Sequence, residues 1–454
     1  MPDRLPETIL GAAAAIRRSE VSSAALIEAA IARAEAVDDR LGAFITRFDD
    51  EARSAAAQAD AELANGRDRG PLHGIPIAIK DILTTREGPT TAQSSAQDPS
   101  WGQGRDAEVV ARLREAGAII TGKTTLSEYA AGFPDPEKPF PVPRNPWDLE
   151  RWAGGSSAGS ASAVAAGLAL GAIGTDTGGS VRIPAGFCGV TGLKTTLGAV
   201  SSDGCLPLAW SFDSIGPMAR TAADCRAILD AIRSPNPTDP VASSTDLAGL
   251  RIGVDRLAGM TAATDDGQPE AFEQALAVFA EAGAEIVECA LPRYVEVTAA
   301  NYVIMLSEGL AYHLPGLRER WHDYGRSTRQ LLSGGLAYSG PDYVQAQRVR
   351  ARSWQETSEL FEQVDFHLSP MATVGAPTLR DLLEGDQSLV FGSLHTPYWA
   401  TVGNPTAAVP IAPTAGGMPL SLQIAGPAGR DAAVLNVAAA FQERTDHHLA
   451  RPPL

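Results

Sequence analysis

Helical and strand-like segments alternate along the chain, and this alternation restricts its fold more than any other feature of the sequence. Residues 75–79 form a short apolar run that is typical of a buried strand, and residues 107–116 have the pattern of a helix. Gly117 ends that helical pattern, and residues 118–121 return to a strand-like run. Segments in this order pack helices against a sheet, so the sequence predicts an α/β protein.

The N-terminal part of the chain has its own composition. Residues 7–65 are rich in Ala, Glu and Arg and carry apolar side chains at helical spacing, which predicts amphipathic helices. We therefore expect residues 1–65 to form an N-terminal helical segment and residues 66–454 to form a single compact domain. Residues 234–248 contain several prolines and predict a surface linker within that domain.

Later segments continue the same alternation. Residues 161–170 are good helix formers with little bulk, which predicts a central helix that other backbones approach closely. A strand at residues 250–254, helices around 268–282 and 341–364, and a strand region at 404–427 are expected to follow.

The charge balance narrows the class of partner. The chain has 54 Asp and Glu against 37 Lys and Arg, which gives a formal net charge of −17. An acidic surface does not suit a phosphate backbone. The N-terminus lacks the order of a signal peptide, and no apolar run approaches the ~18 residues that a membrane span needs. We expect a cytoplasmic protein that binds neither nucleic acid nor a membrane.

The cysteines give no sign of a metal or disulfide framework. The four cysteines are scattered along the chain without a CxxC pair, which argues against both. We expect free thiols, no metal and no other cofactor.

Two short patterns match known motifs but lack the setting that those motifs need. Residues 117–124 match the phosphate-binding pattern G-x-x-x-x-G-K-[ST]. A helix precedes Gly117, however, and the residues between the glycines are strand-like, so their N–H groups should be paired in a sheet. Residues 155–159 match the G-x-S-x-G elbow around Ser157, but a polar stretch broken by Pro146 stands where the elbow needs a strand. We expect neither nucleotide binding nor an elbow there.

Three other segments together indicate serine catalysis without histidine. A Gly/Ser-rich stretch at residues 154–160 precedes Thr-Asp-Thr-Gly-Gly-Ser at residues 175–180, and Lys80 stands at the end of the apolar run 75–79. A serine hydroxyl needs a base to remove its proton, and a lysine is a base only when it is neutral. Burial lowers a lysine pKa from ~10.4 by several units. Of the four lysines in the chain, Lys80 has the clearest buried approach.

The two glycines before Ser180 predict an oxyanion hole. Glycine lets successive backbone N–H groups point toward one place. There they stabilise the oxyanion that forms when a serine attacks a carbonyl, and one such donor can lower the barrier by ~3 kcal/mol. We expect the backbone N–H groups of Thr177, Gly178, Gly179 and Ser180 to supply this site.

The chain resembles the amidase signature enzymes over nearly all of its length. The stretches that carry the resemblance are residues 71–76 with 80–81, 122–124 with 127–129, 144–148, 154–167, 175–192, 403–410 and 417–423. Agreement at so many points in the same order makes the resemblance specific. It implies a mixed, largely parallel central sheet covered by helices on both faces, with residues 66–454 as the catalytic domain.

The resemblance also implies roles for single residues. Ser180 is the implied nucleophile, Ser156 is a bridging serine in a cis peptide bond, and Lys80 is the base. Neutral Lys80 would accept a proton through Ser156 as Ser180 attacks the amide carbon. The proton would then pass to the leaving amine, and water would hydrolyse the acyl-enzyme through the same relay. Ala131 and Gly132 are expected near the acyl group.

Departures from the family pattern concern the surroundings of these residues. Trp152 and Ala153 stand where many relatives have a small residue and a proline, a departure that we expect to affect specificity without touching the three catalytic residues. The Pro-rich residues 133–144 shape the entrance or form a surface loop packed by their own prolines. Further aromatic candidates for the pocket are Trp210, Tyr398 and Trp399.

The implied function is hydrolysis of linear carboxamides through a serine acyl-enzyme. Esters, anilides and carbamates (urethanes) are expected as side substrates because the same oxyanion chemistry serves them. The expected partner is a small-molecule amide, and the expected assembly is a monomer or homodimer. One alternative is the glutaminase subunit of a tRNA-dependent amidotransferase. Arg348 and Arg350 are the candidate residues for binding the carboxylate of glutamine. Another is a binding protein that kept the fold without turnover.

Overall fold

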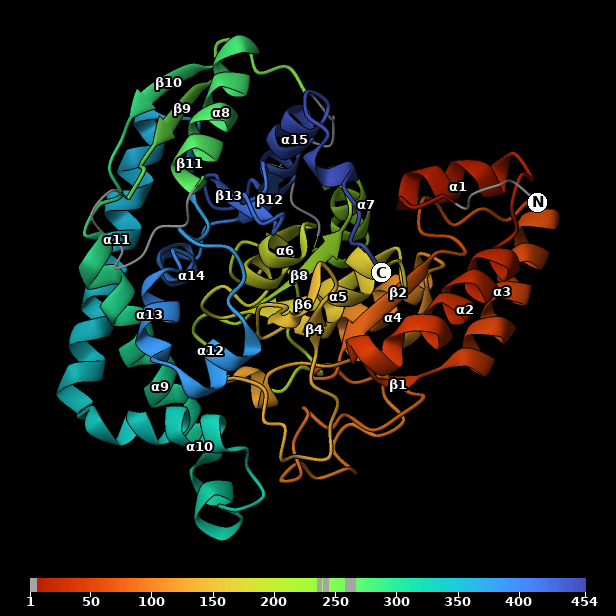
Figure 1. The fold of residues 1–454 in the computed structure, drawn as a ribbon, viewed down its shortest axis with the longest axis horizontal. Coiled ribbons are helices and arrows are strands. Elements are labelled where there is room, and N and C mark those ends of the chain that lie inside the picture. The colour runs from red at the N-terminus through yellow and green to blue at the C-terminus, as the bar shows by residue number, and fades with distance from the viewer. Residues whose placement is uncertain (1–5, 235–238, 240–244, 258–266) are drawn as a thin grey trace.

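The chain folds around a large central sheet with helices packed against it (Figure 1). The structure is a computed structural model that describes residues 6–234, 239, 245–257 and 267–454. Within these residues the sheet has eleven strands in the order β1-β3-β2-β6-β8-β7-β12-β13-β11-β9-β10, and β4 and β5 form a separate two-stranded sheet. Helices α1–α3 lie at one side of the molecule, and α9–α11 lie at the other (Figure 1).

The first half of the chain supplies the strands that carry the predicted catalytic residues. Its helices are α1 (Ile9–Arg17), α2 (Ser23–Leu41), α3 (Asp49–Ala64), α4 (Glu108–Glu115), α5 (Ala158–Ala166), α6 (Arg182–Cys188) and α7 (Ala222–Ile232), with a short 3₁₀ turn η1 (Glu128–Ala130). Its strands are β1 (Phe44–Arg47), β2 (Pro76–Lys80), β3 (Ile119–Thr124), β4 (Arg144–Asn145), β5 (Asp148–Trp152), β6 (Gly171–Asp176), β7 (Thr191–Lys194) and β8 (Ser214–Ala219).

The second half completes the sheet and adds the long helices. Its helices are α8 (Gln268–Glu281), α9 (Tyr294–Glu319), α10 (Arg326–Ser333), α11 (Gly340–Gln363), α12 (Leu379–Glu384), α13 (Gln387–Gly392), α14 (Pro397–Val402) and α15 (Asp431–Gln442), with 3₁₀ turns η2 (Gly334–Ala337) and η3 (His447–Leu449). Its strands are β9 (Arg251–Val254), β10 (Glu285–Glu288), β11 (Phe366–Pro370), β12 (Thr406–Ile411) and β13 (Leu420–Ala425).

The central sheet is mixed, and the predicted fold class is confirmed. Strand β2 pairs in parallel with both β3 and β6, and β9 pairs in parallel with β10 and β11. Antiparallel pairs connect these two parallel groups through β8, β7, β12 and β13. Because β2 and β6 run in the same direction, their carboxyl ends meet at one edge of the sheet, where polar groups can converge on a ligand.

Helices cover both faces of the sheet. In β2, Ile77 and Ile79 belong to a core cluster that includes side chains of α1, α4 and α7, whereas Ala78 between them belongs to a second cluster with α5. Successive side chains of a strand point to opposite faces. The two clusters therefore lie on opposite faces of the sheet, and Lys80, two residues after Ala78, is on the α5 face.

The N-terminal segment differs from the prediction at one place. Its pattern predicts helices throughout residues 7–65, but Phe44–Arg47 form strand β1, which pairs antiparallel with β3 at the edge of the central sheet. Four residues are too few to show a strand period beside strong helical patterns. Most of the predicted linker at residues 234–248 lies outside the described residues.

Helix α5 is as central as its small side chains predict. All of its residues are buried. A Cβ at Gly159 would lie 2.4 Å from the Ala43 carbonyl oxygen and 2.6 Å from the Thr125 backbone nitrogen. Only a residue without a side chain permits this approach, which brings the start of α5 against the loop after β3.

Candidate active site

Lys80 lies at the end of β2 with its amine enclosed by the protein. Its Nζ is 2.7 Å from Ser156 Oγ and 2.7 Å from Thr175 Oγ1, and the whole side chain is buried. Thr175 comes from β6, the parallel neighbour of β2, so the two strand ends place these groups together. Thr175 was not predicted as a site residue, although it stands in the same Thr-Asp-Thr-Gly-Gly-Ser stretch as Ser180.

The burial of Lys80 lowers the pKa of its amine. Loss of hydration is the main cause that lowers its pKa to about 7, whereas the nearby acidic groups of Cys205, Asp213 and Asp176 act in the opposite direction. An amine with this pKa is partly neutral at pH 7 and can accept a proton.

Ser156, which contacts Lys80, and Ser180 lie on two loops that contact each other. The peptide bond between Gly155 and Ser156 is cis. The backbone N–H of Ser157 donates to the Ser180 carbonyl at 3.1 Å, which joins the two loops. Both serines line the same pocket, but Ser156 is buried with its Oγ against Lys80, whereas Ser180 is half-buried. Ser180 is therefore the more exposed serine of this pair.

A buried ion pair supports the loop that carries Ser180. Arg182 donates from Nε and Nη2 to the two carboxylate oxygens of Asp176 at 3.0 and 2.9 Å, and both residues are inaccessible to solvent. The same carboxylate accepts the backbone N–H groups of Gly179 and Val181 at 2.8 and 3.1 Å. Neither charged residue was predicted from the sequence, although both stand within four positions of Ser180.

The bond from Gly179 corrects one part of the predicted oxyanion hole. Because its N–H donates to Asp176, it is already engaged and does not face a substrate. The need for glycine here is steric: its φ is +135°, and a Cβ would lie 2.0 Å from Thr396 Oγ1. The backbone N–H groups of Thr177, Gly178 and Ser180 have no hydrogen-bond partner in the described part of the chain, so three of the four predicted donors remain.

Asp213 binds the side chain of Thr177. Its carboxylate accepts from Thr177 Oγ1 at 2.6 Å and from the backbone N–H groups of Leu208 and Ala209 at 2.9 and 3.1 Å. Burial raises the pKa of Asp213 to about 6. Asp213 thus connects the loop before β8 to the loop after β6.

Burial alone does not single out Lys80 among the lysines, contrary to the expectation from sequence. Lys123 is buried and pairs with Asp81 at 2.7 Å. Lys194 is also buried, with a pKa lowered to about 7 by loss of hydration, and it donates to the Thr195 carbonyl at 2.7 Å. What distinguishes Lys80 is its contact with the Ser156 hydroxyl beside the pocket.

The pocket in front of Ser180 has apolar walls. Aromatic side chains cluster in its lining: Trp152 lies 5.5 Å from Phe133 between ring centroids, and Phe391 lies 5.2 Å from Phe133. Aliphatic side chains such as Met305 also line it. No charged side chain of the described residues lines this pocket. Trp152, a departure from the family pattern in the sequence, is thus part of the wall of this pocket.

Other predicted pocket residues fall in different places. Gly132 lines the pocket, but Ala131 does not; the Ala131 carbonyl accepts a hydrogen bond from Thr328 Oγ1 at 3.2 Å. Trp210 is 56% exposed at the surface, and Tyr398 and Trp399 are fully buried core residues.

The two misleading motifs have the structures that their surroundings predict. Residues 119–124 form β3, paired in parallel with β2, so their backbone is engaged in the sheet as expected. Ser157 is fully buried and its hydroxyl donates to the Thr175 carbonyl at 3.2 Å. Strand β5, upstream of it, belongs to the small two-stranded sheet and not to the central one.

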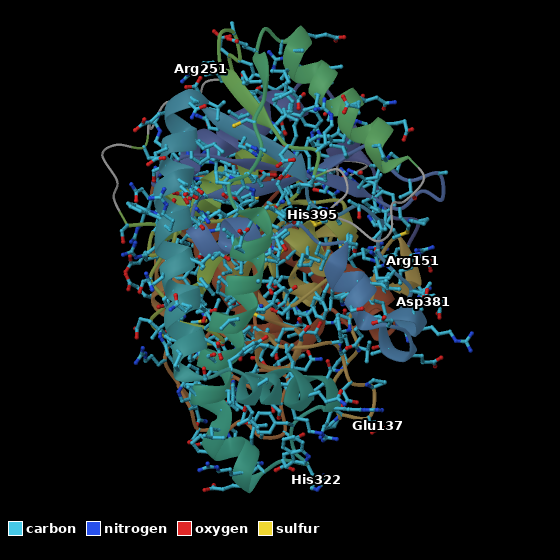
Figure 2. The ribbon with its side chains drawn as sticks, turned by 90° about the vertical axis from the view of Figure 1, so that its left-hand side faces the viewer. Glu137, Arg151, Arg251, His322, Asp381 and His395 are labelled. Atoms are coloured by element: carbon cyan, nitrogen blue, oxygen red, sulfur yellow. The ribbon has the colours of Figure 1, made fainter. Side chains whose placement is uncertain are left out.

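No histidine of the described chain lines the pocket. His395 lies near the middle of the molecule (Figure 2), where its Nδ1 is 2.5 Å from the Tyr294 hydroxyl and burial lowers its pKa to about 4. Among the described residues, no group of three or more His, Cys, Asp and Glu side chains could hold a metal ion. None of the described helices is both long and apolar enough to cross a membrane.

The support from Arg182 has a testable effect on stability. We expect Arg182→Met to lower the free energy of unfolding by about 3–5 kcal/mol, because it leaves the Asp176 carboxylate buried without its cation. Chemical denaturation of both proteins measures the difference. Arg380→Met, which removes an exposed ion pair with Glu384, is the control and should cost less than about 1 kcal/mol. Equal effects of the two substitutions would contradict the supporting role.

Comparison with known proteins identifies the family of the chain. The family model described as Amidase matches residues 25–435. The chain is 37% identical to a glutamyl-tRNA(Gln) amidotransferase subunit of Roseiflexus sp. (strain RS-1), covering 98% of each chain. A crystal structure of an amidase superimposes with a TM-score of 0.87 at 34% identity, covering 96% of this chain and 99% of that one. The native peptide amidase of Stenotrophomonas maltophilia superimposes with a TM-score of 0.84 at 31% identity, covering 98% of each chain. The chain belongs to the amidase family, whose members cleave C–N bonds.

Proposed function

We propose that this protein hydrolyses carboxamides with an apolar acyl group through an acyl-enzyme on Ser180. The observation that carries the proposal is the 2.7 Å contact between Lys80 Nζ and Ser156 Oγ beside an apolar pocket that Ser156 and Ser180 both line. A neutral amine, a bridging hydroxyl and an accessible hydroxyl are the groups that serine catalysis without histidine needs.

The proposed reaction moves one proton through these groups. As Ser180 Oγ bonds to the carbonyl carbon, its proton passes to Ser156 Oγ and the Ser156 proton passes to Lys80 Nζ. The oxyanion accepts hydrogen bonds from the N–H groups of Thr177, Gly178 and Ser180. The proton returns along the same path to the amide nitrogen as the C–N bond breaks. Water then attacks the acyl-enzyme, with Lys80 as the base again, and releases the acid.

The walls of the pocket indicate the class of acyl group. Phe133, Trp152, Phe391 and Met305 offer apolar surface beside Ser180, and burial of apolar surface contributes roughly 25 cal/mol per Å². We therefore propose aryl and medium-length alkyl amides as substrates, with the corresponding esters, anilides and carbamates as side substrates. No metal or organic cofactor takes part in the proposed reaction.

A glutaminase activity is the second candidate, because the Roseiflexus relative at 37% identity over nearly the whole chain is named as part of a glutamyl-tRNA(Gln) amidotransferase. Glutamine carries an α-ammonium and an α-carboxylate, and charged groups enter a pocket only with partners. The described pocket lining has no charged side chain. Arg350 lies elsewhere, where it donates to the Thr401 and Ser211 carbonyls. This is the reason to prefer the apolar amide.

A substrate panel separates the two candidates. We expect kcat/KM for phenylacetamide or hexanamide to exceed that for glutamine by at least about 100-fold, because the ionic groups of glutamine would lose their hydration without compensation. Release of ammonia measures both reactions with the purified chain. Comparable turnover of glutamine, or turnover that requires a partner protein, would favour the amidotransferase function instead.

A further inference from the structure

Asn301 brings an unpaired acceptor to the apolar pocket. It lies on α9, is 1% exposed and lines the pocket with Ser180. Its Oδ1 is buried and has no hydrogen-bond partner among the described residues. Among the buried side-chain acceptors of the described pocket lining, it is the one without a donor. Burying an acceptor without a donor costs about 1–3 kcal/mol. A ligand that donates a hydrogen bond to this oxygen would recover that free energy.

The Asn301 amide contacts the loop that carries Thr177. Its Nδ2 donates to the Thr177 carbonyl at 3.4 Å, which leaves Oδ1 as the free end. Oδ1 is 3.4 Å from the position that a Cβ on Gly178 would occupy. The unpaired acceptor thus lies beside the backbone N–H groups that are proposed to bind the oxyanion.

A ligand that suits this arrangement presents an acceptor and a donor a few bonds apart. A carbonyl oxygen directed at the N–H groups of Thr177 and Gly178 places the substituents of its carbon near Asn301 Oδ1. A carboxamide has an N–H on that carbon, whereas an ester has only an oxygen, which cannot donate.

We propose that Asn301 is a specificity-determining residue whose Oδ1 accepts a hydrogen bond from an N–H of the substrate, so that the site prefers carboxamides to esters of the same acid. This inference rests on the proposed function. A site built to bind a donor discriminates against an analogue that lacks it, because the buried acceptor is then left unpaired.

Asn301→Leu tests the inference with matched substrates. We expect kcat/KM for a primary amide to fall about tenfold, whereas kcat/KM for the methyl ester of the same acid stays constant or rises. The amide-to-ester ratio thus falls about tenfold. Loss of the bond to Thr177 affects both substrates alike and cancels in the ratio. An equal loss for both substrates would show that Asn301 only supports the loop, and would overturn the inference.

Two further variants complete the test. Asn301→Asp keeps the size and an acceptor oxygen, so it should retain the native amide-to-ester ratio of kcat/KM even if both values fall. A lower ratio in this variant contradicts the inference. Met305→Leu changes the wall one helical turn along α9 without removing a hydrogen-bonding group, and it should also leave the ratio unchanged. Either Asn301 variant decides the question if the other does not fold.

The substrate and the proposed function can be examined in the same assay. Esters with an amino or hydroxyl donor on the acyl group show whether Asn301 binds a donor on that part of the substrate. If Asn301→Leu lowers kcat/KM tenfold for those esters alone, Asn301 bonds to the acyl chain and not to the amide nitrogen. That result would overturn the proposed preference for amides. If Ser180→Ala retains activity, the proposed function fails. If Ser180→Ala is inactive and the ratio in Asn301→Leu is unchanged, only the role of Asn301 fails.

Discussion

Ser180→Ala is expected to lower kcat/KM for amides and esters by a factor on the order of 10⁴ to 10⁶, the scale of the loss when a catalytic serine is removed. The variant keeps the backbone N–H groups of the proposed oxyanion hole and the ion pair between Asp176 and Arg182. It loses the oxygen that forms the acyl-enzyme. Initial rates with one amide and its ester measure the effect.

A matched serine outside the site controls for this experiment. Ser54 lies exposed on α3, and Ser54→Ala should hydrolyse both substrates at the native rate. If Ser180→Ala hydrolyses them at more than a tenth of the native rate, the nucleophile is a different group. If the native protein binds amides without turnover, the chain is a binding protein on this fold.

Lys80→Met is expected to reduce kcat/KM by about 10²- to 10⁴-fold, the usual contribution of a general base. The pKa of Lys80 is about 7, and only the neutral amine accepts a proton. Native activity should therefore rise with pH through about 7 and level off above it, falling tenfold per pH unit on the acidic side. Lys80→Met should lose this limb, because the titrating base is gone.

The pH profile of kcat/KM between pH 5 and 9 tests this point. Asp213, with a pKa raised to about 6, loses its proton about one pH unit lower, so the limb that Lys80→Met should lose is the one near pH 7. Lys138→Met is the control, because the Lys138 amine donates to the His322 carbonyl at the surface, and its profile should match the native one. A Lys80→Met enzyme that kept the native acidic limb would exclude Lys80 as the base.

The sequence predicts local elements well where one pattern is strong. The helix at 341–364 and the strand at 250–254 appear as α11 and β9 with little change. Strand β1 was missed because it is four residues long and lies between helices. Helix α9 was not predicted at all, although it has 26 residues, because polar and apolar side chains are mixed around it and Pro315 interrupts its pattern.

Some residues of the candidate site could be predicted from the sequence, and others could not. The Gly/Ser stretches and Lys80 could be recognised from the sequence because they stand in short motifs. Asn301 could not, because it comes from α9, more than 100 positions after Ser180, and only packing brings it beside Thr177. The ion pair of Arg182 with Asp176 was also missed, since a charge next to a glycine pair is usually solvated and its burial is decided by the surrounding sheet.

The proposed acyl-enzyme on Ser180 can be tested most directly by covalent labelling with a fluorophosphonate, a reagent that bonds to an activated serine. Intact mass and peptide mapping should find one adduct per chain, located on Ser180, with none in Ser180→Ala and slow labelling in Lys80→Met. An adduct on Ser156, Ser157 or any other residue, or continued hydrolysis by protein in which Ser180 is fully labelled, would contradict the account.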